Sequence, residues 1–468
     1  MNLQQQIPVL ICHILFVFIL VSCEKDITGD RIQNLPPETT VFIQSDDTLN
    51  FTPSVQQLFW DGRDADGFVT GFFYTFEVNP QPDDWIWTTE RSGIFPLEII
   101  GSDTTYAFQV KAVDNDNLED PTPATQLIPI ANSRPEIEWE IGRAIPDTTF
   151  TVANFAWRAS DPDGDLTIQF FEYALDDTSN WIQIPSTRRQ LSLFEEDGIT
   201  EGQHALFLRA VDIAGAKSRT IRMPENPSSF WYVRAPRGRY LLIDDFAVES
   251  STTGFPDAFY RTALGNVLPQ IGEDFTYWNI EELFPASVDQ FVETLKLFDR
   301  IVWYTDLIVS SDPHFLTAQI AIPEFRQTGG KIIYTVQFSS NFGSQGDPLA
   351  FTPVDSLGER FNIITTNSLY YPDANFSNTF PSLRPLPELR VSNFIIGLIS
   401  LFPQASSVPM YRYDEPNNDD DPIFIMTGQN DNTREHDFVF SGTPLHFLDQ
   451  NNNLEEFLES VIVDLFEN

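Results

Sequence analysis

The chain has 468 residues and a formal net charge of −41, from 68 acidic and 27 basic side chains. A surface this acidic repels phosphate, which excludes nucleic-acid binding and disfavours a polybasic contact with a membrane. Apolar residues make up 42 % of the chain and 41 residues are Phe, which is enough to build hydrophobic cores. At roughly 100–200 residues per domain, the length indicates several domains.

An apolar run at the N-terminus predicts an export signal. Residues 9–21 are apolar apart from one histidine, and the run ends in Leu20-Val21-Ser22-Cys23. Its 13 residues are fewer than the ~20 that span a bilayer, which fits the hydrophobic part of a signal peptide. The final four residues resemble the lipobox of bacterial lipoproteins, although no Lys or Arg precedes the run.

The lipobox resemblance implies a signal peptide over residues 1–22, a lipid on Cys23 and a tether over 23–35. The lipid would anchor the protein to the bacterial cell envelope, at the outer membrane or the cell surface, without a transmembrane helix. Both cysteines, Cys12 and Cys23, lie in this segment. The rest of the chain therefore has no disulfide, thiolate metal site or cysteine nucleophile.

The first half of the chain contains an internal repeat. Trp60 and Trp157 are 97 residues apart, and each is followed by the pattern Asp-x-Asp-Gly, at Asp64 and at Asp161. Further landmarks recur at nearly the same spacing: Trp85 with Trp181, and the run 106–114 with the run 204–212. This spacing defines two copies of one module.

The sequence pattern predicts a β-sandwich for each copy. Apolar and polar residues alternate along 106–112, which is the period of a strand, and Asp-x-Asp-Gly is typical of a turn between strands. Short strands, turn signals and about 100 residues per copy fit a β-sandwich. The early tryptophan and the aromatic-rich late strand resemble fibronectin type III or immunoglobulin-like modules. We place these over residues 36–131 and 132–236.

Asp161, Asp163 and Asp165 form a candidate Ca²⁺ site because oxygen ligands at alternate positions suit that cation. Leu166 stands where an EF-hand loop needs Gly, which favours a plain turn. The tryptophans of the two copies are a candidate sugar-stacking platform, but the recurrence of Trp85 and Trp181 favours a structural role.

The pattern changes to alternating strands and helices over residues 237–468. Strands are predicted over 239–246, 275–280, 300–306 and 331–336, and helices over 255–271, 288–298, 315–327 and 454–466. Strands this apolar predict a mostly parallel sheet that is covered on both faces. We expect an irregular insertion over about 338–422, with a short helix at 394–402.

The order of these motifs resembles the class I glutamine amidotransferase-like domains, which have a flavodoxin-like fold. The matching segments are 241–245, 259–264, 298–303, 329–331 and 440–445. Enzymes of that fold use a cysteine nucleophile. This chain has no cysteine beyond Cys23, so the resemblance implies a domain that lacks that chemistry.

Carboxylates follow two of the predicted strands. Ligands of open α/β sheets bind at the carboxyl ends of strands, so Asp244, Asp245 and Asp306 form a candidate site for Mg²⁺ or Ca²⁺. The alternative is that Asp245 and Asp306 cap the helices that follow. Ser339-Ser340 lack the Gly-x-Ser-x-Gly pattern of a nucleophile elbow, which favours a polar loop over a serine site.

The sequence thus predicts a multidomain fold, with two all-β sandwiches followed by an α/β domain with a mostly parallel sheet. The favoured function is a lipid-anchored, non-catalytic binding or scaffolding protein of the cell envelope. Its partner would be a glycan, a peptide or another envelope protein, and the only cofactor candidates are Ca²⁺ and Mg²⁺. The alternative is an exported hydrolase with a carboxylate–metal or serine site in the α/β domain.

Overall fold

The computed structural model describes residues 33–43, 55–97, 103–143, 145, 147–250, 253–285, 287–309, 311–339, 347–416 and 420–467. Cys23 and the predicted signal peptide lie outside these residues. The chain divides into two compact units, residues 1–132 and 133–468. Within the described ranges, every helix is too short or too polar to cross a membrane.

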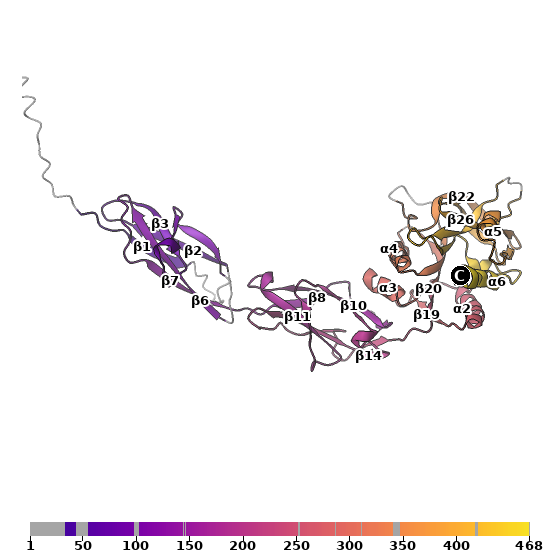
Figure 1. Cartoon of the computed structure of the whole chain (residues 1–468), viewed down its shortest axis with the longest axis horizontal. Helices are drawn as coiled ribbons and strands as arrows, with labels where there is room; N and C mark the ends of the chain where they lie inside the picture. The colour runs from indigo at the N-terminus through magenta and orange to yellow at the C-terminus, as the bar shows by residue number, and fades with distance from the viewer. Residues whose placement is uncertain are drawn as a thin grey trace, which may run out of the picture. The chain divides into compact units, whose positions relative to one another are not determined.

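The first unit is a sandwich of two antiparallel sheets (Figure 1). One sheet has the order β1 (Glu38–Ile43), β2 (Val55–Arg63), β5 (Ser92–Pro96). The other has the order β4 (Ile86–Thr88), β3 (Val69–Thr75), β6 (Asp103–Asp114), β7 (Ala124–Ala131). Trp60, Phe72 and Phe108 are buried between the sheets. The predicted β-sandwich is therefore confirmed.

The second unit begins with another sandwich. One of its two larger sheets has the order β13 (Gln190–Phe194), β10 (Val152–Ser160), β8 (Glu136–Trp139). The other has the order β12 (Ile182–Pro185), β11 (Ile168–Leu175), β15 (Leu206–Asp212), β16 (Ile221–Met223). A small sheet joins β14 (Gly202–His204), β17 (Trp231–Val233) and β9 (Thr148–Thr149). Trp157 on β10 is buried as Trp60 is on β2, so the two repeats share this core position.

Five parallel strands form one half of the sheet in the remainder of the second unit. They are β19 (Phe275–Asn279), β18 (Tyr240–Asp245), β20 (Arg300–Ile308), β21 (Lys331–Phe338) and β28 (His436–Ser441), in that spatial order. Both faces of the sheet are apolar, and alternate residues of β18 belong to different hydrophobic cores. Leu241 and Ile243 pack in the core on one face, and Tyr240 and Leu242 pack in the core on the other.

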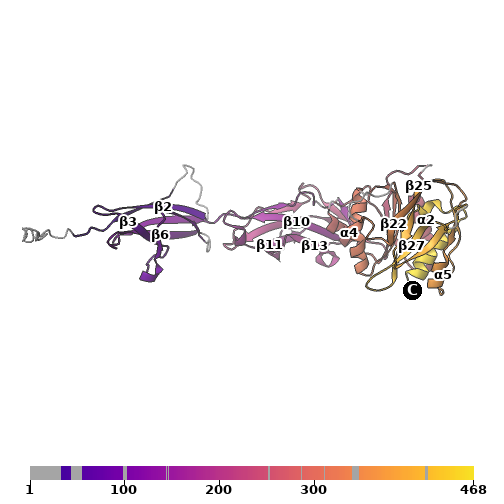
Figure 2. The same ribbon diagram turned by 90° about the horizontal axis from the view of Figure 1, so that it is seen from above.

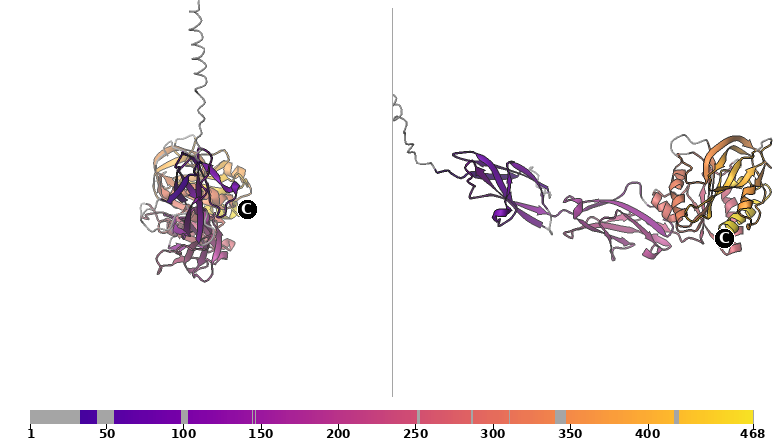
Figure 3. Two further views of the ribbon diagram at one scale, coloured as in Figure 1. Left: turned by 90° about the vertical axis from the view of Figure 1, so that its left-hand side faces the viewer. Right: turned by 45° about the horizontal axis from the view of Figure 1, so that its top comes forward.

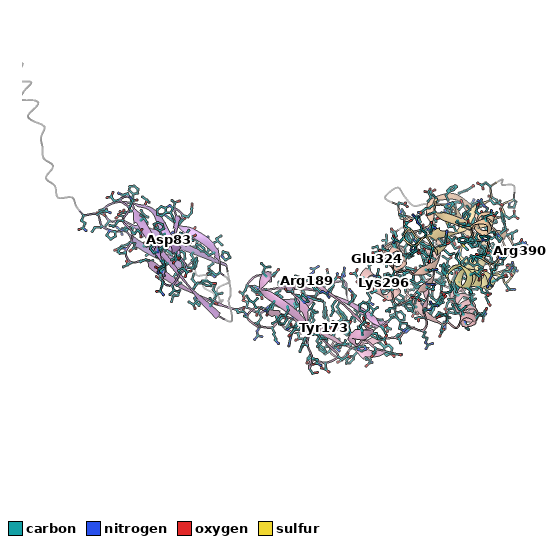
Figure 4. The ribbon with its side chains drawn as sticks, viewed as in Figure 1. Asp83, Tyr173, Arg189, Lys296, Glu324 and Arg390 are labelled. Carbon is teal, nitrogen blue, oxygen red and sulfur yellow. The ribbon has the colours of Figure 1, made fainter. Side chains whose placement is uncertain are left out.

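Helices cover both faces of these strands (Figures 2 and 3). One face carries α3 (Val288–Leu295) and α4 (Pro313–Gln327). The other carries α2 (Pro256–Val267) and α6 (Leu454–Glu459), which continues as a π-helical segment, Ser460–Leu465. Figure 4 shows Lys296 and Glu324 on the side of α3 and α4, and Arg390 on the other side of this α/β part.

The prediction of an irregular insertion over 338–422 is wrong. The chain there forms β22 (Val354–Ile364), β23 (Leu369–Pro372), α5 (Ala374–Thr379), β24 (Leu389–Arg390), β25 (Ile395–Pro403) and β26 (Ser407–Tyr413), followed by β27 (Ile423–Gln429). The helix expected at 394–402 is β25, because a short apolar run fits a buried strand as well as a helix. β27 pairs antiparallel with β28, so the whole sheet is mixed.

The second sandwich packs directly on the α/β part. Phe150 lies edge-on against Trp278 and Phe298, with ring centroids 5.7 and 5.8 Å away. Gln290 of α3 is 2 % exposed; its Nε2 donates to the Val152 carbonyl at 3.0 Å, and its Oε1 accepts from the Asn154 amide at 2.6 Å. These contacts join β10 to α3 through buried atoms.

Candidate functional site at the carboxyl edge of the sheet

The carboxyl ends of β18 and β20 form the point where the sheet changes its winding. The chain leaves β18 for α2 on one face, but it leaves β20 for α4 on the other. Open α/β sheets bind ligands at the point where two such connections diverge. This edge is therefore the place to look for functional side chains.

Three potential metal ligands meet at this edge. Asp245 ends β18, Glu281 follows β19, and His314 lies in the first turn of α4. The Nδ1 atom of His314 is 2.5 Å from Asp245 Oδ1 and 3.4 Å from Glu281 Oε1. The indole of Trp303 donates to the other Asp245 oxygen at 2.9 Å. We call Asp245, Glu281 and His314 the edge cluster.

Burial shapes the charge of the edge cluster. The Asp245 side chain is 6 % exposed, and this burial raises its pKa to about 7 although the bonds from His314 and Trp303 oppose the shift. Burial alone would lower the pKa of His314, but the hydrogen bond and charge of Asp245, with Glu281 and Asp312 adding, raise it. Asp245 and His314 therefore compete for one proton near neutral pH.

Of the three carboxylates that the sequence predicted as one site, Asp244, Asp245 and Asp306, only Asp245 belongs to the edge cluster. Asp244 faces the other side of the sheet, where it accepts from the Tyr277 hydroxyl at 2.5 Å and from the Phe246 amide at 3.1 Å. Burial raises its pKa despite these bonds. Asp306 lies within β20, but its side chain is outside the described part. A cation shared by Asp244, Asp245 and Asp306 stays a prediction.

The helix-capping alternative is wrong for both residues it named. The residue before α2 is Phe255, and α4 is capped by Asp312, whose side chain accepts from the amides of His314 and Phe315. Sequence reasoning missed Glu281 and His314 as partners of Asp245. The one available signal was Asp312-Pro313, which marks the start of a helix and so places His314 beside the strand ends.

A cavity of about 280 Å³ opens at the carboxyl edge of the sheet, and none of the three edge-cluster residues lines it. Its walls come from the segments after β18 and β28, the last residues of β20 and β21, and the start of β25. They are mostly apolar: Phe246, Val248, Thr253, Leu307, Gln337, Phe394, Ile395, Ile396, Pro444, His446 and Phe447. Leu307 and Ile396 remain 55 % and 58 % exposed. Gln337 Nε2 donates to the Ile396 carbonyl at 2.6 Å, which fixes β25 to the end of β21.

His446, in the cavity wall, is held in its neutral form. Its ring lies against Phe447, with centroids 4.3 Å apart, and its Nε2 donates to the Thr253 carbonyl at 3.1 Å. Burial lowers its pKa to about 4, although the Thr253 bond opposes the shift. In the described structure neither His446 nor His436 forms a hydrogen bond with Ser339, and Ser340 is outside it. Among the described residues, Ser339 is therefore not paired with either histidine.

The Asp-x-Asp-Gly turns hold the first residues of each sandwich. Asp163 Oδ2 accepts from the Ser133 amide at 2.6 Å, as Asp66 does from the Leu35 amide at 3.1 Å. Within the second turn, Asp161 accepts from the Asp163 amide and Asp165 from the Asp161 amide. Burial, followed by the nearby charges of Asp163 and Asp212, raises the pKa of Asp161. These contacts explain the turn without a cation, and Ca²⁺ at Asp161, Asp163 and Asp165 stays a prediction.

The repeated tryptophans have repeated partners. Lys111 lies over the ring of Trp85 at 4.2 Å, and Arg209 lies over the ring of Trp181 at 3.8 Å. A cation over an indole face stabilises the fold and covers the surface that a sugar would stack on. These contacts support the structural role of the two residues.

No family model matches the chain, and no curated protein matches it. Among solved structures, the fibronectin(III)-like modules of Clostridium thermocellum CbhA are 15 % identical, covering 42 % of this chain and 95 % of theirs, with a TM-score of 0.18. A two-domain fibronectin type III segment of chicken tenascin is 14 % identical, with coverages of 40 % and 96 % and a TM-score of 0.22.

The mmIFT52 N-terminal domain is 10 % identical to this chain, with coverages of 49 % and 97 % and a TM-score of 0.31. The sandwich fold described above rests on the strand pairing and buried core of this chain itself.

Proposed function

We propose that this chain is a binding protein of the bacterial cell envelope, anchored by lipid on Cys23, and that its α/β part takes up an apolar group at the carboxyl edge. The observation that carries the proposal is the mostly apolar cavity of about 280 Å³. Ligand pockets are concave, largely apolar and few per protein, with a small number of polar groups that orient the ligand. Gln337, Thr253 and His446 are the polar residues of this lining.

The order of the parallel strands supports this placement. The sequence β19-β18-β20-β21-β28 corresponds to the order 2-1-3-4-5 of flavodoxin-like sheets, whose ligands bind at the crevice beside the first strand. A cavity of this size and lining accommodates an apolar side chain better than a hydrated sugar. We therefore favour a peptide or another envelope protein over a glycan, with the sandwiches acting as spacers.

Replacing Ile396 with Glu should weaken binding at the cavity. It should not unfold the protein, because the Ile396 side chain is already 58 % exposed. The probe is the apolar dye anilinonaphthalene sulfonate, whose fluorescence rises in an apolar site. A charge in the cavity wall should weaken dye binding by roughly tenfold or more. Ile182→Glu is the matched control, since Ile182 is 54 % exposed on the second sandwich. Equal dye binding by the two variants would contradict the proposal.

The anchor makes a separate prediction. Mass spectrometry of the mature protein from a bacterial membrane fraction should find a first residue at Cys23 that carries acyl chains, and Cys23→Ala should release the protein from the membrane. An unmodified Cys23 in the membrane-bound protein would refute lipid anchoring and leave ligand binding to be judged by the dye experiment.

One observation favours a second candidate, a hydrolase that uses a carboxylate–metal site. Asp245, Glu281 and His314 offer ligand atoms that all lie within 4.8 Å of one another. A hydrolase of this type requires a metal ion there to activate water. The candidate fails if these three residues bind no metal.

A further inference from the structure

We propose that Asp245, Glu281 and His314 bind a single divalent transition-metal ion, of which Zn²⁺ is the best match. This inference does not rest on ligand binding in the apolar cavity described above. It starts from side chains that lie far apart in the sequence and reach one point by way of β18, the segment after β19 and the first turn of α4.

The set of donor atoms selects the kind of metal. One imidazole nitrogen and two carboxylate oxygens suit Zn²⁺, which is commonly held by three protein ligands with a fourth position left for water or substrate. Mg²⁺ and Ca²⁺ prefer oxygen ligands throughout. The imidazole of His314 thus separates this site from the Mg²⁺ or Ca²⁺ site that the sequence predicted at the same edge.

The ligand atoms are close to the spacing that a metal needs. Two ligands of one tetrahedral Zn²⁺ ion, at bonds of about 2.0–2.1 Å, lie about 3.3 Å apart. The distance from His314 Nδ1 to Glu281 Oε1 is 3.4 Å, and that to Asp245 Oδ1 is 2.5 Å. For these two distances, metal binding requires only the Asp245–His314 pair to open, by less than an ångström, and all three ligand atoms lie within 4.8 Å of one another. Glu281, with 34 % of its side chain exposed, is the most accessible of the three ligands.

Neighbouring groups hold the ligands as metal sites usually do. Trp303 donates to the Asp245 oxygen that does not face His314, which orients the carboxylate. The Phe284 ring packs on the His314 imidazole, with centroids 4.1 Å apart. A buried hydroxyl gives independent support: Tyr334 OH is fully buried and has no hydrogen-bond partner in the described structure. Burial, followed by the charges of Asp245 and Asp312, raises the pKa of this hydroxyl. A water on the metal would supply a partner for such a group.

A second histidine–aspartate pair shows what a purely structural arrangement looks like in this chain. His204 Nδ1 lies 3.0 Å from an Asp176 oxygen, and His204 Nε2 donates to the Thr200 carbonyl at 2.7 Å. Both ring nitrogens are thus used, and one carboxylate faces the ring. In the edge cluster two carboxylates face the same nitrogen of His314, which is the arrangement of ligands around an ion.

Isothermal titration of the purified full-length chain with ZnCl₂ near neutral pH tests the proposal. The wild type should bind one Zn²⁺ ion saturably, and Glu281→Gln, His314→Gln and Asp245→Asn should each weaken that binding by at least roughly tenfold. Glu281→Gln is the decisive variant, because its partly exposed side chain can be changed without disturbing the core. MgCl₂ and CaCl₂ should give no saturable binding at this site.

Two matched controls separate the site from the general acidity of the chain. Asp244→Asn changes the adjacent carboxylate, which faces Tyr277 on the other side of the sheet, and His436→Gln changes a histidine at the start of β28, the opposite edge. Both should bind Zn²⁺ within about twofold of the wild type. The proposal is overturned if the wild type shows no saturable binding, or if Glu281→Gln and Asp244→Asn bind Zn²⁺ equally.

Discussion

Replacing Phe150 with Ala should lower the free energy of unfolding by about 3–5 kcal/mol, the usual cost of removing a buried phenylalanine from a packed core. Phe150 belongs to the second sandwich, yet its ring is 4 % exposed and is inserted among Trp278 and Phe298 of the α/β part. The cavity left behind would lie between the second sandwich and the α/β part. We therefore expect these two parts to unfold less cooperatively in the variant. Urea unfolding followed by tryptophan fluorescence measures both effects.

Phe230→Ala is the matched control, because Phe230 lies on the same sandwich with 48 % of its surface exposed. Its replacement should cost less than about 1 kcal/mol and leave the second sandwich and the α/β part unfolding in one transition. Gln290→Ala should act in the same direction as Phe150→Ala, since it leaves the Val152 carbonyl and the Asn154 amide without their buried partner. If Phe150→Ala and Phe230→Ala behaved alike, the two parts would not be coupled through this contact.

Acidification should destabilise the protein partly through His446. Burial lowers the pKa of this histidine from 6.5 to about 4, so the unfolded chain takes up the proton more readily than the folded one. The stabilising effect is complete above about pH 6.5 and is lost as the pH falls toward 4. A difference of this size corresponds to about 3 kcal/mol. The free energy of unfolding should therefore fall less steeply over this range in His446→Gln than in the wild type.

The comparison between variant and wild type matters because many carboxylates also titrate below pH 5. Their contribution is common to both proteins and cancels in the difference. Proton NMR of the His446 ring gives a direct check, since its titration midpoint in the folded protein should lie near 4. If the free energy of unfolding changed with pH in the same way in His446→Gln and in the wild type, the prediction would be wrong. The His446 ring would then titrate as it does in water, and the cavity wall would not exclude its charged form.

Much of the architecture could be predicted from the sequence because it follows from local patterns. Alternation of apolar residues defines β6 and β15, and the spacing of apolar residues at helical period defines α2 and α3. The repeat located Trp60 and Trp157 at the same core position. The strands from β22 to β26 were missed because polar residues and Pro break the apolar runs of β22 and β26, and the apolar run of β25 fits a helix as well as a buried strand.

The candidate site divides in the same way. By itself, the sequence determined the order of the modules and the presence of carboxylates at the strand ends, Asp245 among them, since both follow from the local period and from the chain direction. Only the tertiary structure decided which side chains meet Asp245. His314 is 69 residues away and reaches Asp245 because β20 pairs with β18. Asp244, the adjacent residue, points away because successive side chains of a strand face opposite sides of the sheet.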